Sequence, residues 1–410
     1  MIIGIDVGSH KIAALIGEAL PGPKGGIRIL GVGHAPAEGI RAGEIVHVDD
    51  AAGAIAASVD RAERLAGDTF IDAVVGITGL HVRSRNNAAA VPCGRRPRPI
   101  GPEDVARVLD AAGTLPIAAE REVLHVLPRH FRVDDGPAVR DPSGMEAFQL
   151  ESSVHVVTAS QSALNNLRRC LDLAEVAPAR LALSTLAAAE ASLTEDERQL
   201  GVVVADFGHA VTGVACYQEG ALVHSATIGL GGRHLTNDLA VVFQTPFAQA
   251  ERLKQTHGHV LPEHDDERIE VEVTPFGEEA SRQVRRRDVS EVLAARVDEI
   301  ADMVAAEIGE ANFADGPPAG VVLVGGGTEL QGLARRLHER WALPVRIGRP
   351  RDVTGLTDAA GGPGHAAAVG LLMWSQRQVE DHAPLSSVGA RNGMMGWMRE
   401  ALLPRRNGRS

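Results

Sequence analysis

The same short pattern occurs twice in this sequence, about half a chain apart. In each copy a run of apolar residues ends at an aspartate, a glycine follows two positions later, and polar side chains come next; the copies span 4–9 and 204–212. The apolar run predicts a buried strand, and the glycine permits a tight hairpin whose backbone N–H groups can face an anion. Either copy alone is more simply an ordinary turn. Their repetition favours two facing loops that clamp a metal–phosphate group, with Asp6 and Asp206 holding Mg²⁺ through bound water.

The composition limits the class of protein. At 410 residues the chain is too long for one hydrophobic core, which predicts two or more domains. Aromatic residues make up only 3%, so aliphatic side chains must fill the cores, and a net charge of −12 argues against a nucleic-acid surface. The three cysteines show no disulfide or zinc spacing, and the sequence shows no leader and no apolar run of the ~20 residues that span a bilayer. We expect a cytoplasmic protein, or one attached to a membrane from the cytoplasmic side.

Strand-like and helix-like segments are mixed along the chain. Apolar runs predict strands at 1–5, 13–17, 27–34, 73–78, 153–158, 201–205, 213–218 and 320–324. Helical patterns are found at 50–66, 160–174, 249–255, 291–312 and 330–341. The mixture of hairpin and crossover spacings predicts an α/β fold with mixed sheets.

A Pro- and Arg-rich stretch at 91–99 interrupts this organisation. It is followed by a helical pattern at 101–112 and by strand-like runs at 122–133 and 147–158. These elements form a self-contained unit within the larger pattern. They predict a small inserted subdomain.

A third glycine loop, 325–327, follows the buried run that ends at 324. Consecutive glycines let a flat ring approach the backbone, although for this segment alone a strand-to-helix turn, in which Thr328 caps the following helix, is the simpler interpretation. Glu251 and Lys254 share one helical face and suit either ribose hydroxyls or a surface ion pair. The flexible segment 229–234 lacks the dinucleotide fingerprint.

Because no Walker lysine, nucleophile elbow or His-Glu-x-x-His motif is found, classical P-loop, hydrolase and zincin functions are excluded.

The last twenty residues carry a second distinctive signal. Five arginines against one glutamate give 391–410 a net charge of +4, and a polar linker precedes this segment at 376–390. Most of its apolar residues fall within one arc of a helix, although Leu403 lies on the far side. A basic amphipathic helix on a linker predicts a membrane-surface anchor rather than a helix docked on its own domain. The residues expected to contact the membrane are Met394, Met395, Trp397, Met398, Leu402, Arg399, Arg405 and Arg406.

With three glycine loops in this order, the chain resembles the superfamily of actin, DnaK-type chaperones and sugar kinases. The segments 124–128, 140–145, 151–158 and 231–240, together with the terminal helix, resemble the FtsA family of bacterial cell-division proteins more closely. The resemblance extends from the first residue to about Leu372. It implies an α/β, actin-like fold of two lobes with an FtsA-type inserted subdomain and a C-terminal amphipathic helix.

The resemblance also implies ATP and Mg²⁺ between the lobes, with no catalytic residue assigned. The implied nucleotide-binding residues are Asp6, Gly8, Ser9, His10 and Lys11 in the first loop, Asp206, Gly208 and Thr212 in the second, Gly231 and Gly232 beside it, Glu251 and Lys254 at the ribose, and Gly325, Gly326 and Gly327 at the adenosine. The second loop lacks the Gly- and Thr-rich sequence of the chaperones. We therefore expect slow hydrolysis at most.

The implied domains follow from the same resemblance. They are 1–79 with 159–199 as the core of lobe I, 80–158 as the inserted subdomain, 200–231 with 295–375 as the core of lobe II, 232–294 as the outer lobe II subdomain, 376–390 as the linker and 391–410 as the membrane helix. The implied role is to polymerise, to bind the C-terminal peptide of FtsZ and other division proteins, and to tether FtsZ filaments to the inner face of the cytoplasmic membrane at the septum. A PilM-like pilus assembly protein is the main alternative, and a chaperone or sugar-kinase ATPase is a second.

Overall fold

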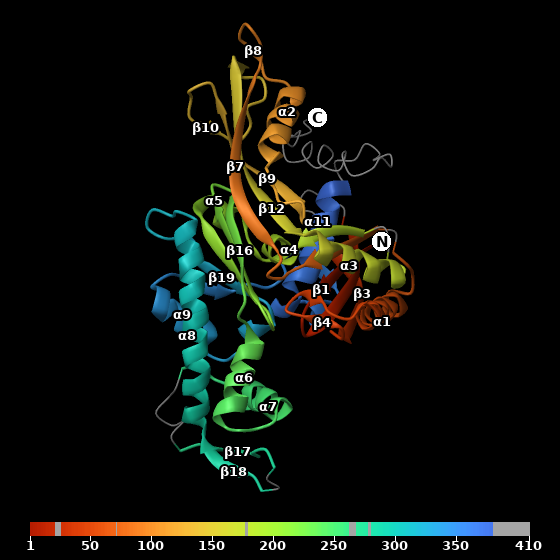
Figure 1. The fold of residues 1–410 in the computed structure, drawn as a ribbon, viewed down its shortest axis with the longest axis vertical. Coiled ribbons are helices and arrows are strands. Elements are labelled where there is room, and N and C mark those ends of the chain that lie inside the picture. The colour runs from red at the N-terminus through yellow and green to blue at the C-terminus, as the bar shows by residue number, and fades with distance from the viewer. Residues whose placement is uncertain (21–25, 71, 177–178, 262–267, 278–279, 380–410) are drawn as a thin grey trace.

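Two mixed sheets, one in each lobe, carry the two copies of the repeated pattern (Figure 1). The computed structural model describes residues 1–20, 26–70, 72–176, 179–261, 268–277 and 280–379. In strand order, the lobe I sheet comprises β13 (Ala179–Leu183), β6 (Asp72–Ile77), β1 (Ile2–Val7), β2 (Lys11–Ala19), β3 (Ile27–Pro36) and β21 (Val353–Gly355). The lobe II sheet comprises β16 (Ala221–Ile228), β15 (Thr212–Gln218), β14 (Val202–Phe207), β19 (Val321–Val324) and β20 (Val345–Ile347).

The two sheets repeat one local topology. β1 pairs antiparallel with β2 and parallel with β6, and β14 pairs antiparallel with β15 and parallel with β19. Asp6 lies opposite Ala13, and Asp206 lies opposite Gly213, at the same place in each hairpin. The prediction that each copy of the pattern is a strand followed by a tight hairpin is confirmed.

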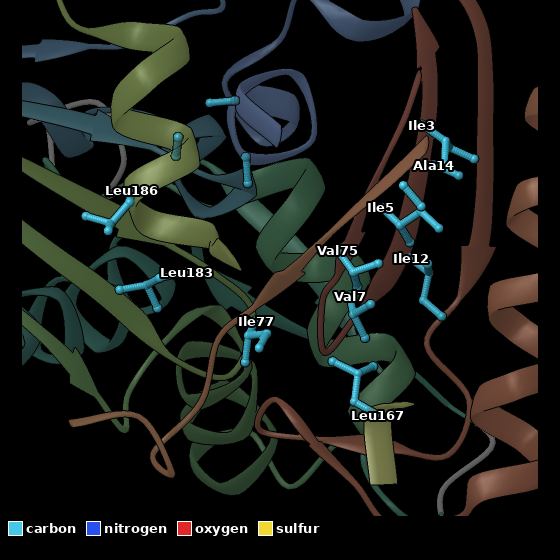
Figure 2. Packing of buried hydrophobic residues seen from close by; sticks show 14 of the residues in the cluster. Ile3, Ile5, Val7, Ile12, Ala14, Val75, Ile77, Leu167, Leu183 and Leu186 are labelled. Carbon is cyan, nitrogen blue, oxygen red and sulfur yellow. The ribbon is translucent and has the colours of Figure 1, made fainter. Parts of the chain in front are cut away.

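Helices cover the sheets and fill the space between them. They are α1 (Val48–Ala66), α3 (Gln161–Leu173), α4 (Ser184–Ser192), α5 (Glu195–Leu200), α9 (Leu333–Trp341), α10 (Thr357–Ala360) and α11 (Ala366–Val379), and a small hairpin of β4 (Ile40–Arg41) and β5 (Glu44–Ile45) precedes α1. The aliphatic side chains of β1, β2 and β6 pack together with those of α3 and α4 (Figure 2). This aliphatic core agrees with the low aromatic content.

The helices α4 and α11 approach each other unusually closely. A Cβ atom added to Gly370 of α11 would lie 1.7 Å from the carbonyl oxygen of Ala187 in α4. Backbone cannot move aside as a flexible side chain can, so this crossing requires glycine. By contrast, a Cβ atom on Gly53 of α1 would meet nothing within 4 Å.

These two helical glycines predict opposite responses to alanine. We expect Gly370→Ala to lower the free energy of unfolding by about 1–3 kcal/mol or more, because the added methyl group overpacks the α4–α11 contact. We expect Gly53→Ala to raise it by about 0.4–1 kcal/mol, because alanine has fewer unfolded conformations. Urea unfolding of both variants measures the difference. Equal stability of the two variants would contradict this reading of the helix crossing.

The inserted subdomain is a separate unit at one end of the molecule (Figure 1). Its elements are β7 (Arg83–Pro92), β8 (Arg98–Pro99), α2 (Pro102–Gly113), β9 (Arg121–Val133), β10 (Ala138–Val139), β11 (Glu146–Ala147) and β12 (Gln149–Ser160). Four strands form a sheet in the order β10-β9-β12-β7, and side chains such as Leu109, Phe131 and Leu150 build a core of their own. The predicted helix and both predicted strands of the unit are present, and β7 is an additional strand.

The outer lobe II subdomain lies at the opposite end of the long axis (Figure 1). It contains α6 (Gly232–Val242), α7 (Phe247–His257), β17 (Glu270–Val273), β18 (Arg282–Arg285) and the first turns of α8 (Arg286–Glu310). Residues of α6, α7 and α8 share one buried cluster with β14 and β19 of the lobe II sheet.

Near the end of the described chain, α11 runs to Val379, so residues 376–379 of the expected linker are helical. The rest of that linker and the expected amphipathic helix at 391–410 lie outside the described residues. None of the described helices combines the length and apolarity needed to cross a bilayer.

Candidate functional site

The two aspartates of the repeated pattern lie close enough for their charges to interact. Asp6 accepts a hydrogen bond of 3.0 Å from the Ser184 hydroxyl. Burial raises the pKa of Asp6, and burial together with the Asp6 charge raises the pKa of Asp206 to about 7. A divalent cation between two such carboxyl groups would favour their charged forms. Among the described residues no group of three or more His, Cys, Asp and Glu forms a metal cage, so Mg²⁺ here would keep several of its waters.

The loops that follow the two aspartates face each other. The ring centroids of His10 and His209, one from each loop, are 4.9 Å apart. Each loop needs its glycine, because a Cβ atom on Gly8 would lie 2.7 Å from the Lys11 carbonyl oxygen and one on Gly208 equally close to that of Val211. The two turns are therefore alike in geometry as well as in sequence.

Lys11 brings a positive charge to this space. Its ammonium lies 3.1 Å from Nε2 of His365, which is 2.9 Å from Nε2 of His34. Burial, followed by the charge of Lys11, lowers the pKa of both histidines, to about 4 for His365. Burial lowers the pKa of Lys11 as well, whereas the charges of Asp6 and Glu329 favour its charged form. An anionic ligand in this space would favour the charged form further.

The third glycine loop packs against the second. Gly325 has φ +88°, and its added Cβ atom would lie 2.4 Å from Oδ1 of Asp206. Gly327 is similarly confined by Phe207, whereas Gly326 has open space on its Cβ side. That open side suits the approach of a flat ring. The Thr328 hydroxyl donates to the Gly325 carbonyl at 2.7 Å within a short 3-10 helix, Gly326–Glu329, while the next α-helix begins only at Leu333.

The segment around Gly231 and Gly232 also lies against the second loop. The Gly232 amide donates to the Gly208 carbonyl at 3.0 Å. Lys254 donates to the Gly232 carbonyl at 3.0 Å and to Oε2 of Glu251 at 2.7 Å, and both side chains are largely buried. Although burial acts to raise the pKa of Glu251, hydrogen bonds from Lys254 and Thr236 hold it below its usual range. The pair is thus an internal anchor of α7 to this segment rather than a surface ion pair.

Two predicted loop hydroxyls already have protein partners. The Thr212 hydroxyl is fully buried and donates to the Leu230 carbonyl at 2.8 Å. The Ser9 hydroxyl accepts from the Gly43 amide, in the turn between β4 and β5, at 2.9 Å. Direct phosphate contact by Thr212 would require rearrangement, because its hydroxyl proton is already donated to Leu230. The Ser9 hydroxyl only accepts and keeps its proton to donate to a phosphate.

Three further residues of the site were not singled out from the sequence. Ser184 contacts Asp6 across 178 positions, and His34 and His365 contact each other across 331. Only the fold brings them together, and their local sequence gives no signal of it.

The comparisons with known proteins agree with this architecture. Residues 203–370 match the family model described as Cell division protein FtsA, and residues 79–158 match the model described as the SHS2 domain inserted in FtsA. A Pseudomonas aeruginosa protein named Cell division protein FtsA is 35% identical over 390 residues, which cover 95% of this chain and 93% of the relative.

The chain belongs to the FtsA family of cell-division proteins. A Rhizobium meliloti FtsA is also 35% identical, with 97% of this chain and 94% of the relative covered. An Escherichia coli FtsA is 31% identical, with 92% and 90% covered. The expected FtsA-type inserted subdomain is confirmed by the match at 79–158, and the domain bounds given above stay predictions.

Solved structures show the same fold at lower identity. A chain of the PilM-PilN type IV pilus biogenesis complex gives a TM-score of 0.65 at 18% identity and covers 91% of this chain and 98% of its own length. MreB5 of Spiroplasma citri bound to ADP gives 0.56 at 12% identity, with 93% and 98% covered. The predicted actin-like fold is confirmed. The PilM-like alternative shares this fold but not the sequence identity of the FtsA relatives.

Proposed function

We propose that this FtsA-family chain binds Mg·ATP between its two lobes. The observation that carries the proposal is the pair of facing Asp–Gly hairpins with two interacting, half-buried carboxyl groups. Lys11, whose charged form Asp6 favours against the effect of burial, is proposed to contact the phosphates, and the open side of Gly326 suits the base. Two solved structures of the similarly folded MreB5 of Spiroplasma citri contain ADP and AMPPNP, which supports a nucleotide here. Turnover is slow, because we assign no general base.

In the cell, the proposed role is to polymerise and to tether FtsZ filaments to the inner face of the cytoplasmic membrane at the septum. Family membership supports a role in division. The inserted subdomain would contribute to the filament contact; Met145 and Phe148 on it are 40% and 53% exposed, as an apolar contact surface requires. Other division proteins would then gather on the filament.

The C-terminal peptide of FtsZ is proposed to bind the outer lobe II subdomain, 232–294. Its arginines at 285–287 offer positive charge to an acidic peptide, although Arg285 pairs with Asp288 at 2.7 Å and Arg287 with Glu291 at 2.8 Å. Val241 and Phe276 in the same subdomain are 67% and 66% exposed. Apolar contact therefore supports this surface as much as charge does.

Two measurements test the proposed function. Calorimetry should show ATP binding that weakens strongly when EDTA removes Mg²⁺. Sedimentation with anionic vesicles should carry FtsZ into the pellet only when this chain is present. Substrate-dependent ADP release at metabolic rates would instead favour the sugar-kinase alternative, and failure to recruit FtsZ would contradict the tethering role.

A further inference from the structure

One side chain of the inserted subdomain reaches into the core of lobe I. His125 lies on β9 and is buried, and its Nε2 accepts a hydrogen bond of 3.1 Å from the backbone amide of Leu183. Its ring centroid is 5.3 Å from that of Trp374 on α11. Leu183 itself packs in the lobe I core (Figure 2).

The chemistry of this contact fixes the state of the imidazole. Because Nε2 accepts from an amide, it carries no proton, and the ring is neutral with its proton on Nδ1. Burial lowers the pKa of His125 to about 4, so this state persists at neutral pH. A hydrocarbon side chain at this position would leave the Leu183 amide buried without its acceptor.

Leu183 is the last residue of β13 and the N-cap of α4. Ser184, the next residue, donates its hydroxyl to Asp6. Thr185 follows, and its hydroxyl oxygen would lie 2.0 Å from a Cβ atom on Gly213, the residue opposite Asp206. The first turn of α4 therefore touches Asp6 itself and β15, the strand that pairs with β14 at Asp206.

This turn has little room to move. A Cβ atom on Gly76 would lie 2.5 Å from the Ser184 hydroxyl oxygen, and α4 packs on α11 at the close approach of Gly370 to Ala187. The His125 imidazole contacts both helices, through the Leu183 amide and the Trp374 ring. A displacement of β9 would therefore move His125 and shift the start of α4 with it.

We propose that His125 is a positioning residue that couples the docking of the inserted subdomain to nucleotide binding. It holds the start of α4, which places the Ser184 hydroxyl on Asp6. If nucleotide binding orders the first turn of α4, it also favours docking of the inserted subdomain. Thermodynamic linkage then requires that docking raise the nucleotide affinity by the same factor. The inference rests on the proposed binding of Mg·ATP.

The chain offers a matched control in His155, on β12 of the same subdomain. Its Nε2 lies 2.9 Å from the Ser225 hydroxyl and its Nδ1 2.7 Å from Oδ1 of Asn86, and burial lowers its pKa to about 3. Neither of these two hydrogen-bond partners belongs to α4 or to the glycine loops. Because Ser225 lies on β16 of lobe II, His155 also holds the subdomain against a lobe, but away from α4. Its loss therefore tests whether removal of any buried, hydrogen-bonded docking histidine has the same effect.

The test compares Mg·ATP affinity by calorimetry in the unaltered chain and in His125→Leu, His125→Gln and His155→Leu, with thermal unfolding of each. We expect His125→Leu to weaken binding about tenfold. His125→Gln, whose side-chain carbonyl can accept from the Leu183 amide, should recover most of the affinity. His155→Leu should stay within about twofold. Adding Ser184→Ala to His125→Leu should weaken binding by less than the product of the two separate losses, because both act on one contact.

Hydrogen exchange tests the inference even if His125→Leu folds poorly, because it is measured on the unaltered chain and on His125→Gln. In the unaltered chain, Mg·ATP should slow amide exchange in both 183–192 and 121–133, and in His125→Gln it should do the same. If the unaltered chain binds Mg·ATP and His125→Leu binds it with the same affinity, the inference is wrong. The same holds if His155→Leu weakens binding as much as His125→Leu does. Both results would leave the proposed function standing. Absence of Mg·ATP binding by the unaltered chain would overturn the proposed function and the inference with it.

Discussion

Truncation of the chain after Ala390 is expected to abolish binding to anionic vesicles and to leave Mg·ATP binding unchanged. Each arginine near an anionic surface contributes about 1 kcal/mol, so the net charge of +4 in 391–410 supplies roughly 4 kcal/mol at best. Partial burial of Trp397 and the methionines adds a few kcal/mol. After the ordering of the segment, a single copy should bind with a dissociation constant of ~10 μM to ~1 mM.

Such an anchor becomes strong only when many copies act together. A filament that carries many tails binds with far higher avidity than one subunit, so assembly would switch the membrane attachment on. The rest of the chain carries a net charge of −16, which opposes the approach of a lone subunit to an anionic surface. Vesicle sedimentation at concentrations below and above those that support filaments measures this difference.

Two substitutions separate the apolar face from the charge of this segment. Trp397→Glu and Leu403→Glu change the net charge equally, but only Trp397 lies on the predicted apolar arc. We expect Trp397→Glu to abolish vesicle binding and Leu403→Glu to weaken it modestly. High salt should reduce binding only in part, because the apolar face is not screened. Tight, salt-insensitive binding by a variant that cannot assemble would contradict the avidity argument.

Local patterns in the sequence were sufficient to predict the two hairpins and the inserted subdomain. Each hairpin is specified by adjacent residues, because the apolar strand, the aspartate and the obligatory glycine of the turn all lie within nine positions. The same holds for the helix and the two long strands of the insert. Sequence periodicity reports such local structure well.

Elements buried on all sides were missed. Every residue of α4 except Glu190 is buried, so its sequence shows no alternation between an apolar and a polar face. The described part of α11 is similarly apolar. The strand β7 was missed for the opposite reason, since its arginines, asparagines and alanines lie on an exposed edge strand and have low strand propensity. Tertiary packing decides the structure of all three.

Replacement of Asp206 by asparagine should stabilise the chain in the absence of metal and abolish its stabilisation by Mg·ATP. The pKa of Asp206 is raised to about 7 by burial and by Asp6. Between its unfolded pKa near 4 and this value, the folded state binds more protons than the unfolded state, so stability falls as the pH rises through that range. At about 1.4 kcal/mol per pKa unit, the charged carboxylate costs a few kcal/mol above pH 7.

The thermal unfolding temperature in EDTA measures this cost as the difference between Asp206→Asn and the unaltered chain. We expect the advantage of the variant to grow from pH 5 to pH 8. The difference between the two proteins is used because the half-buried histidines His209 and His365, whose pKa is lowered to about 4, titrate in the opposite sense and affect both proteins alike. Asp315→Asn, at an exposed position, is the control and should show no such trend.

Addition of Mg·ATP should reverse the order of the two proteins. A cation held between the aspartates turns the unfavourable carboxylate of Asp206 into a favourable one, and ligand binding raises stability in proportion to the logarithm of ligand concentration over its dissociation constant. The unaltered chain should therefore unfold at a higher temperature with Mg·ATP than with EDTA, whereas Asp206→Asn should change little. Equal stabilisation of both proteins by Mg·ATP would show that the Asp206 carboxylate does not hold the metal. If Asp206→Asn were less stable than the unaltered chain in EDTA, burial and the Asp6 charge would not make the charged carboxylate unfavourable.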